Sequence, residues 1–264
     1  PFERMKAAIQ DCEQALKLDP APAHAWNTAA YLYGRSALLF DQRGFDPSES
    51  FATAIAAYDR ALERNPALAD SWAGRGAVLV NLGLHTAGKG DDPLPHYERA
   101  IESFGKALAL QPGDAITWVW RGNAEANRAQ ALKGRGADAL PANAAARECY
   151  GKAVALNASS PEAWMRLGNS WGDGAELLRG AGKDAAASVA EAEAAYRKAL
   201  ELNPRYAEAY VRRGILRLAA GRDRTGPGGD PRERYRAAVE DFDRAPALNP
   251  ADAHALPERG RTRS

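Results

Sequence analysis

Apolar and small residues recur along this chain in a pattern that repeats every 46 residues. In each copy they lie three or four residues apart, in two separate runs, which is the spacing of one face of a helix. The first run opens on an aromatic residue, at Trp26, Trp72, Trp118, Trp164 and Tyr210. The second run pairs an alanine with an aromatic residue four positions later, as at Ala54 and Tyr58. Each copy therefore predicts two amphipathic helices.

Glycine and proline mark further positions in the same register. A proline closes the copies at Pro20, Pro66, Pro112, Pro204 and Pro250, and Ala158 stands at the remaining position. A glycine follows the opening aromatic residue by four positions at Gly76, Gly122, Gly168 and Gly214. Glycine inside a helix costs about 1 kcal/mol relative to alanine. Its recurrence predicts a place where a neighbouring helix comes too close for a side chain.

Between the two helices, a glycine and an aspartate recur two residues apart, as at Gly44 with Asp46 and Gly90 with Asp92. Glycine there indicates the end of the first helix, and aspartate indicates the N-cap of the second. The second helix is expected from near Pro47 to about Arg64. Before the glycine, the stretches 36–40 and 175–179 are expected to lengthen the first helix, whereas 84–88 and 222–226 are expected to be looser.

The recurring order of residues resembles the tetratricopeptide repeat, whose signature is W-x-x-L-G, then A-x-x-x-F, then P. Trp164, Leu167 and Gly168 form the clearest copy, with Trp171 where that signature has tyrosine. The family repeat has about 34 residues, so about twelve are added here between the two helices. The resemblance implies an all-α fold, an α–α solenoid or superhelix of helical hairpins, without separate domains.

The register divides residues 1–264 into one array. It comprises a half repeat at 1–20, full repeats at 21–66, 67–112, 113–158, 159–204 and 205–250, and a degenerate half repeat at 251–264. The last segment has Leu256 in place of tryptophan and is interrupted by Pro257.

The charge balance argues against two classes of partner. The formal net charge is +1, so no strong field favours nucleic acid or a membrane surface. No apolar run approaches the 18 or more residues of a membrane-spanning helix.

The two cysteines, Cys12 and Cys149, lie three repeats apart, which is too far for a disulfide between stacked repeats. Their separation favours a reduced, cytoplasmic setting.

Residues that could carry chemistry are few. The four histidines show no metal-ligand spacing with cysteines or carboxylates. The run from Gly83 to Gly90 resembles a phosphate-binding loop but has Gly90 where serine or threonine is required, and no strand precedes it. We therefore expect no catalytic, cofactor or metal site, and the chain is not expected to be an enzyme.

The family resemblance implies that the face formed by the first helices binds an extended peptide or a partner helix. The positions that flank the tryptophan and glycine register there are Asn27, Tyr31, Asn81, Asn123, Asn127, Arg166, Asn169 and Arg212. Amide and guanidinium groups suit a peptide backbone or a carboxylate. The alternative is that these side chains only solvate the surface. Trp120 and Trp171 lie outside the register, and the sequence leaves their exposure open.

The sequence thus predicts a protein–protein interaction scaffold or adaptor. Two alternatives differ in class. The chain could be the regulatory array of a larger bacterial signalling enzyme, such as a serine/threonine kinase, whose arrays carry a similar Gly-x-Asp-Pro insert. It could also self-assemble head to tail through the apolar faces of its terminal half repeats, as a homo-oligomer.

Overall fold

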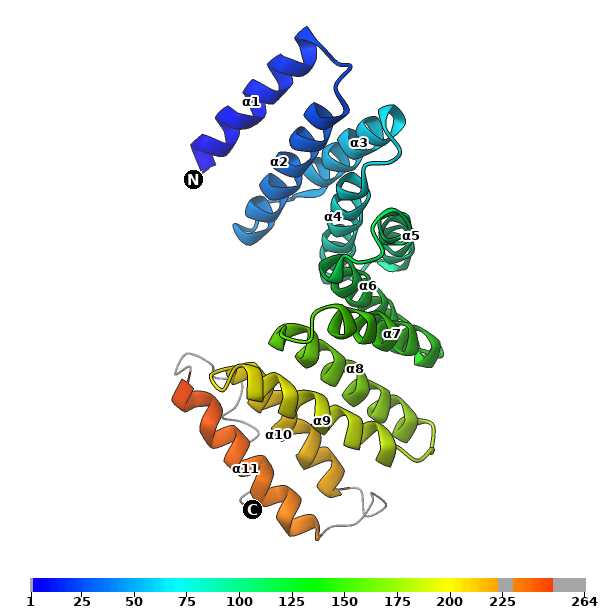
Figure 1. The fold of residues 1–264 in the computed structure, drawn as a ribbon, viewed down its shortest axis with the longest axis vertical. Coiled ribbons are helices and arrows are strands. Elements are labelled where there is room, and N and C mark those ends of the chain that lie inside the picture. The colour runs from blue at the N-terminus through cyan, green and yellow to red at the C-terminus, as the bar shows by residue number, and fades with distance from the viewer. Residues whose placement is uncertain (1, 223–229, 249–264) are drawn as a thin grey trace. The chain divides into compact units, whose positions relative to one another are not determined.

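The structure is a computed structural model that describes residues 2–222 and 230–248; side chains are described for 7–222 and 230–245. The first helices of the repeats are α2 (Ala23–Gln42), α4 (Ala69–Gly88), α6 (Ala115–Gly134), α8 (Pro161–Gly180) and α10 (Ala207–Arg222). The second helices are α1 (Phe2–Leu18), α3 (Ser48–Arg64), α5 (Leu94–Leu110), α7 (Leu140–Leu156), α9 (Ala186–Leu202) and α11 (Pro231–Leu248). No strand occurs within these described residues, so the predicted all-α solenoid class is confirmed (Figure 1).

The helices belong to two compact units, residues 1–136 and 137–264. In the first unit α2 pairs with α3 and α4 pairs with α5; in the second, α8 pairs with α9 and α10 pairs with α11. First helices of neighbouring repeats also touch, α2 with α4, α4 with α6, and α8 with α10. The predicted single array over 1–264 stays a prediction, and its last half repeat, 251–264, lies outside the described residues.

Three hairpins, α4–α5, α8–α9 and α10–α11, bring an aromatic ring against a glycine. Gly76 of α4 faces the ring of Phe104 in α5, and a Cβ placed on the glycine would lie 2.7 Å from that ring. Gly168 meets Tyr196 and Gly214 meets Phe242 in the same way, 28 residues later in each case. Phe104 and Phe242 are fully buried. The close approach predicted from the glycine register is confirmed at Gly76, Gly168 and Gly214.

The added residues extend the first helix equally in every full repeat from α2 to α8, each of which has 20 residues. The expectation of a looser segment at 84–88 is wrong, because α4 continues to Gly88. Gly88 does not end the helix early, because it is itself the last residue of α4. The turn of the backbone comes two residues later, at Gly90. Gly90 has φ of 85°, and its N–H donates to the carbonyl of Ala87. A left-handed glycine that closes a helix in this way satisfies carbonyls left unpaired at its end.

The recurring aspartate caps the second helix, as predicted. Asp46 Oδ1 accepts from the N–H of Ser48 at 3.0 Å, and Pro47 already has helical angles. The same contact to the residue two positions later is made by Asp92, Asp138, Asp184 and Asp230, at 2.9–3.0 Å. Asp92 also pairs with Arg135, and Asp46 pairs with Lys89 at 3.2 Å. In the first unit, the cap of one repeat is therefore tied to the loop of the next.

Candidate functional site

The tryptophans that open the repeats hold the turns between hairpins. The indole Nε1 of Trp26 donates to the carbonyl of Pro20 at 2.9 Å. Trp72, Trp118 and Trp164 make the same bond to the residue six positions earlier, at 2.8–2.9 Å. These rings are half-buried, and those of Trp26 and Trp164 pack against the core. The sequence placed these residues in the repeat register, but it did not reveal the polar role of the indole.

One stripe of each first helix is accessible to solvent along its whole length. The stripe takes every third and fourth residue, which places its members on one side of the helix. In α2, α4 and α6 we call it the unit 1 face. Its residues are Thr28, Tyr31, Arg35, Leu38, Gln42, Gly74, Ala77, Asn81, Leu84, Gly88, Trp120, Asn123, Asn127, Gln130 and Gly134; every one of them is exposed or half-buried.

The matching stripe of α8 and α10 we call the unit 2 face. Its residues are Arg166, Asn169, Asp173, Glu176, Gly180, Arg212, Ile215, Ala219 and Arg222. Arg166 and Arg212 each lie near the glutamate one turn earlier, at 3.5 Å from Glu162 and 3.7 Å from Glu208. The two faces therefore differ in chemistry, although they occupy the same positions of the repeat.

The structure places all of the predicted site residues on first helices, but two of them take part in the packing. The Oδ1 atom of Asn27 accepts a hydrogen bond from the Ser71 hydroxyl at 2.7 Å, which joins α2 to α4. The Oδ1 atom of Asn169 accepts from the Tyr196 hydroxyl at 2.8 Å, within one hairpin. Asn169 and the other six, namely Tyr31, Asn81, Asn123, Asn127, Arg166 and Arg212, lie in the accessible stripes, and Asn27 does not.

Aromatic side chains lie at both ends of the unit 1 face. The Tyr31 side chain on α2 is 57% exposed, and Trp120 on α6 is 40% exposed. Trp120 packs on Phe104 with 6.3 Å between ring centroids. Tyr31 lies close to Tyr58, whose burial, together with Tyr31, raises the pKa of the Tyr58 phenol to about 12. Trp120 could have been found from its spacing of three and seven residues from Asn123 and Asn127.

Between these aromatic residues, α4 presents small side chains. The ring of Tyr58 reaches Gly74, where an added Cβ would lie 2.3 Å from the phenol oxygen. Ala77 is one turn further along, and Asn81 follows. The middle of the unit 1 face is thus small and uncharged, with aromatic rings of the second helices beneath it.

Trp171, whose exposure the sequence left open, is half-buried in the second unit. The Arg147 guanidinium stacks over its ring at 4.5 Å from the centroid. Burial lowers the pKa of Arg147 below its ordinary value. Trp171 therefore packs inside the second unit, whereas Trp120 lies on the accessible surface of the first.

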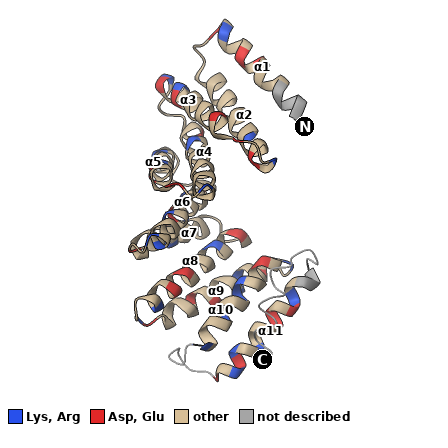
Figure 2. Ribbon diagram, turned by 180° about the vertical axis from the view of Figure 1, so that it is seen from behind, with Lys and Arg blue, Asp and Glu red and all other residues tan. Residues whose placement is uncertain are grey.

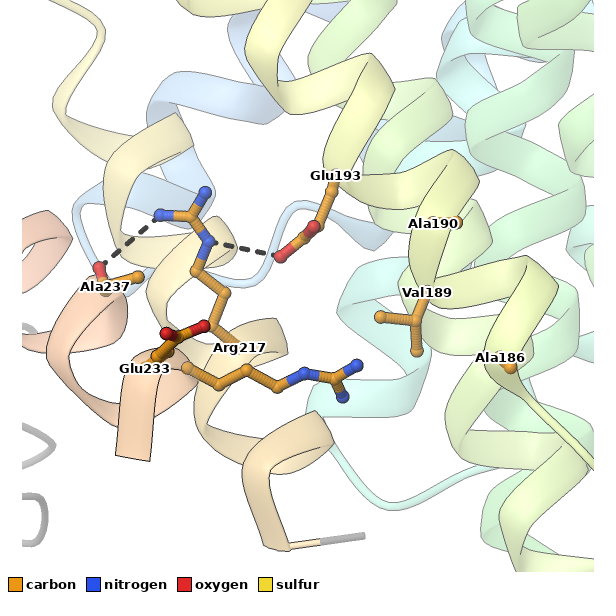
Figure 3. Close-up of a pocket in the computed structure, with 8 residues that line it drawn as sticks. Ala186, Val189, Ala190, Glu193, Arg217, Glu233 and Ala237 are labelled. Atoms are coloured by element: carbon orange, nitrogen blue, oxygen red, sulfur yellow. Dashed lines mark hydrogen bonds and ion pairs between the residues drawn. The ribbon is translucent and has the colours of Figure 1, made fainter. Parts of the chain in front are cut away.

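A pocket of about 330 Å³ lies between α9, α10 and α11 of the second unit. Ala186, Val189, Ala190, Glu193, Arg217, Glu233, Arg234 and Ala237 line it (Figure 3). Arg217 Nε donates to Glu193 at 3.1 Å, and its Nη1 donates to Asp241 at 2.9 Å. Charges of both signs meet here, and the central guanidinium is already held by two carboxylates.

Both acidic and basic residues occur on the described helices of each unit (Figure 2). None of the helices in the described part of the chain combines the length and apolar character needed to cross a bilayer.

Comparison with known proteins agrees with the geometry. Models of the tetratricopeptide repeat match residues 48–88 and 188–206. No curated protein matches the chain by sequence. Among solved structures, YrrB, described as a TPR protein with an unusual peptide-binding site, is 20% identical. The matched region covers 94% of this chain and 97% of YrrB, with a TM-score of 0.55.

Two further structures share the fold. PilF of Pseudomonas aeruginosa has 15% identity and a TM-score of 0.61, with 98% of this chain and 91% of PilF covered. A thermophilic TPR protein of Thermus thermophilus has 17% identity and a TM-score of 0.56, with 89% and 98% covered. At such identities the likeness concerns the fold. The two family matches identify tetratricopeptide repeats at residues 48–88 and 188–206, and the glycine–aromatic hairpins have the order of residues of that repeat.

Proposed function

We propose that this chain is a non-enzymatic scaffold whose first helices bind a peptide segment of a partner protein. The observation that carries the proposal is the accessible stripe on α2, α4 and α6, and its counterpart on α8 and α10. These stripes keep large groups such as Tyr31 and Trp120 exposed. Exposed aromatic residues are enriched where proteins bind one another.

The chemistry of the stripes suits a peptide backbone. Asn81 and Asn127 occupy the same position in neighbouring repeats, and Asn123 lies one turn from Asn127. A carboxamide both donates and accepts hydrogen bonds, as a peptide group does. Because each first helix is fixed by its own hairpin, the stripe is formed before a partner arrives, which lowers the ordering cost of binding. The fold of YrrB, described with a peptide-binding site, is consistent with this use.

The test is a peptide-display selection against the intact chain, followed by calorimetric titration of the selected peptides. Tyr31→Ala, Asn127→Ala and Arg212→Ala change the stripes. Lys198→Ala changes α9, a second helix, at a side chain that is 46% exposed. We expect at least one stripe variant to weaken binding about tenfold, since few residues dominate an interface, and Lys198→Ala to leave it unchanged. Failure to select any peptide, or loss confined to Lys198→Ala, would exclude the proposal.

The two alternative functions, a regulatory array within a larger signalling enzyme and head-to-tail self-assembly, remain predictions from the sequence.

A further inference from the structure

The unit 1 face carries far fewer charges than the rest of the chain. Charged residues make up 26% of the sequence, so about four of its fifteen positions would be charged at the average frequency. Arg35 is the one charged residue among them. The stripes of α4 and α6 have none: Gly74, Ala77, Asn81, Leu84 and Gly88 on one helix, and Trp120, Asn123, Asn127, Gln130 and Gly134 on the next.

The unit 2 face shows that the repeat does not require this composition. At the matching positions α8 has Arg166, Asp173 and Glu176, and α10 has Arg212 and Arg222. The hairpin packing is the same in both units, since Gly168 meets Tyr196 as Gly76 meets Phe104. The lack of charge on the stripes of α4 and α6 is therefore a property of this surface and is not required by the fold.

The accessible apolar groups of this face lie where a bound chain would need anchors. Tyr31 and Trp120 stand on α2 and α6, with the small residues Gly74 and Ala77 on α4 between them. Leu84, which is 48% exposed, lies further along α4. Neighbouring packed helices lie about 8–10 Å apart, so three of them span on the order of 20 Å. An extended peptide of about six residues covers that distance.

We propose that the unit 1 face recognises an uncharged, apolar segment of a partner in extended conformation. The inference rests on the proposed function and names the chemistry of its ligand. A charged side chain placed on the stripes of α4 and α6 would lose water without meeting an opposite charge on them, which is unfavourable. An aliphatic or aromatic side chain would fit the small surface of α4 between Tyr31 and Trp120. The carboxamides of Asn81 and Asn127 would meet the peptide backbone.

Three sets of blocked peptides of about eight residues provide the probe: apolar and uncharged, acidic, and basic. We expect the apolar set to bind the intact chain best, with little change in affinity between low and high salt, because screening acts on charges. Tyr31→Ala and Trp120→Ala should each weaken that binding about tenfold. Lys198→Ala, at an exposed position of the second helix α9 outside both faces, is the control and should not weaken it.

A second variant guards against a loss of packing, because Trp120 contacts Phe104. Asn81→Asp changes one atom and adds a charge at the centre of the face, so it should weaken binding of the apolar set while circular dichroism stays unchanged. If the chain instead binds acidic or basic peptides best, and substitutions on the first helices abolish that binding, the inference is wrong while the proposed function stands. Binding of no set at all would count against both.

Sedimentation velocity separates a partner from a second copy of the chain. If the chain dimerises with rising concentration, and both Tyr31→Ala and Trp120→Ala abolish the dimer, the occupant is another copy and the inference is wrong. A chain that stays monomeric while binding the apolar set supports it.

Discussion

At the scale of single residues, the fold depends on pairs that the repeat places 28 positions apart. Gly76 with Phe104, Gly168 with Tyr196 and Gly214 with Phe242 each bring an aromatic ring against a helix backbone. The glycine removes the one atom that would prevent the contact. The helix loses about 1 kcal/mol of intrinsic propensity at each site, and the buried ring offsets that loss through contacts that alanine would displace.

Gly76→Ala should destabilise the chain by about 1–2 kcal/mol. The new methyl would meet the fully buried Phe104 ring, and overpacking of that kind costs about 1–3 kcal/mol, partly offset by better helix propensity. Urea denaturation followed by circular dichroism measures the change. Gly105→Ala, in α5, is the matched control, because nothing lies within 4 Å of its added Cβ. It should raise stability by about 0.5–1 kcal/mol; an equal loss in both variants would refute the packing role.

Asp241→Ala should be more damaging, at about 3–5 kcal/mol. The carboxylate is 2% exposed and accepts from Arg213 Nε and Nη2 and from Arg217 Nη1. Burial by itself lowers the pKa of Arg213, but the hydrogen bond and charge of Asp241 outweigh it and raise that pKa. Removal of the carboxylate leaves two guanidinium groups without their shared partner. Glu240→Ala, at the exposed neighbouring position, should change the free energy of unfolding by less than about 0.5 kcal/mol.

At the scale of elements, the added residues lengthen α2, α4, α6 and α8, and a left-handed glycine follows each of these helices. The next aspartate then caps the second helix, so the glycine loop and the aspartate cap recur together in these four repeats. In the first unit the loop and the cap also join neighbouring repeats, through Asp46 with Lys89 and Asp92 with Arg135. Because these ion pairs are exposed, they contribute little to stability. Their main effect is to align the loop of one repeat with the helix cap of the repeat before it.

Asp92→Asn tests that link through its dependence on pH. Hydrogen bonds from Arg135 and from the N–H of Leu94 lower the pKa of Asp92 below its ordinary value. Because the pKa of Asp92 is lower in the folded state, its stabilisation is complete when the pH is above the pKa of the unfolded chain, about 3.9. The stabilisation is lost as the pH falls through the pKa of the folded state. The parent chain should therefore exceed the variant in urea midpoint at pH 7, with the difference fading below about pH 4. Glu98→Gln, at an exposed position of α5, should show no such trend.

At the scale of the whole molecule, each unit has apolar clusters of its own. One cluster joins residues such as Phe51, Leu79 and Phe104, and another joins Met165, Tyr196 and Leu216. Every buried member of each cluster belongs to a single unit. Repeat proteins are stabilised by contacts within and between adjacent repeats, so that a part of the array can fold.

A fragment of residues 1–136 should therefore remain helical and unfold cooperatively. Far-ultraviolet circular dichroism and urea denaturation provide the measurement, with the whole chain as reference. We expect helix content per residue close to that of the intact chain. A fragment with the spectrum of an unfolded chain would show that the first unit depends on residues beyond Gly136.

The sequence by itself determined the repeat, the two helices in each copy, the close helix approach at the recurring glycine and the aspartate cap. These follow from periodicity and local backbone chemistry, which depend on residues close in sequence or related by the 46-residue step. It also proposed eight site residues. It could not tell that Asn27 and Asn169 form hydrogen bonds with side chains of neighbouring helices, because the position of a residue on its own helix does not reveal which side chains of other helices contact it.

Only the tertiary structure decided which of these polar and aromatic side chains face solvent. Trp72 and Trp120 are both aromatic and both lie on first helices, but one indole is turned to the carbonyl of Pro66 and the other is exposed beside Asn123. The low charge of the unit 1 face likewise emerged when accessible positions were separated from buried ones. The physical reason is that exposure depends on how helices distant in sequence pack, which the period of one helix does not encode.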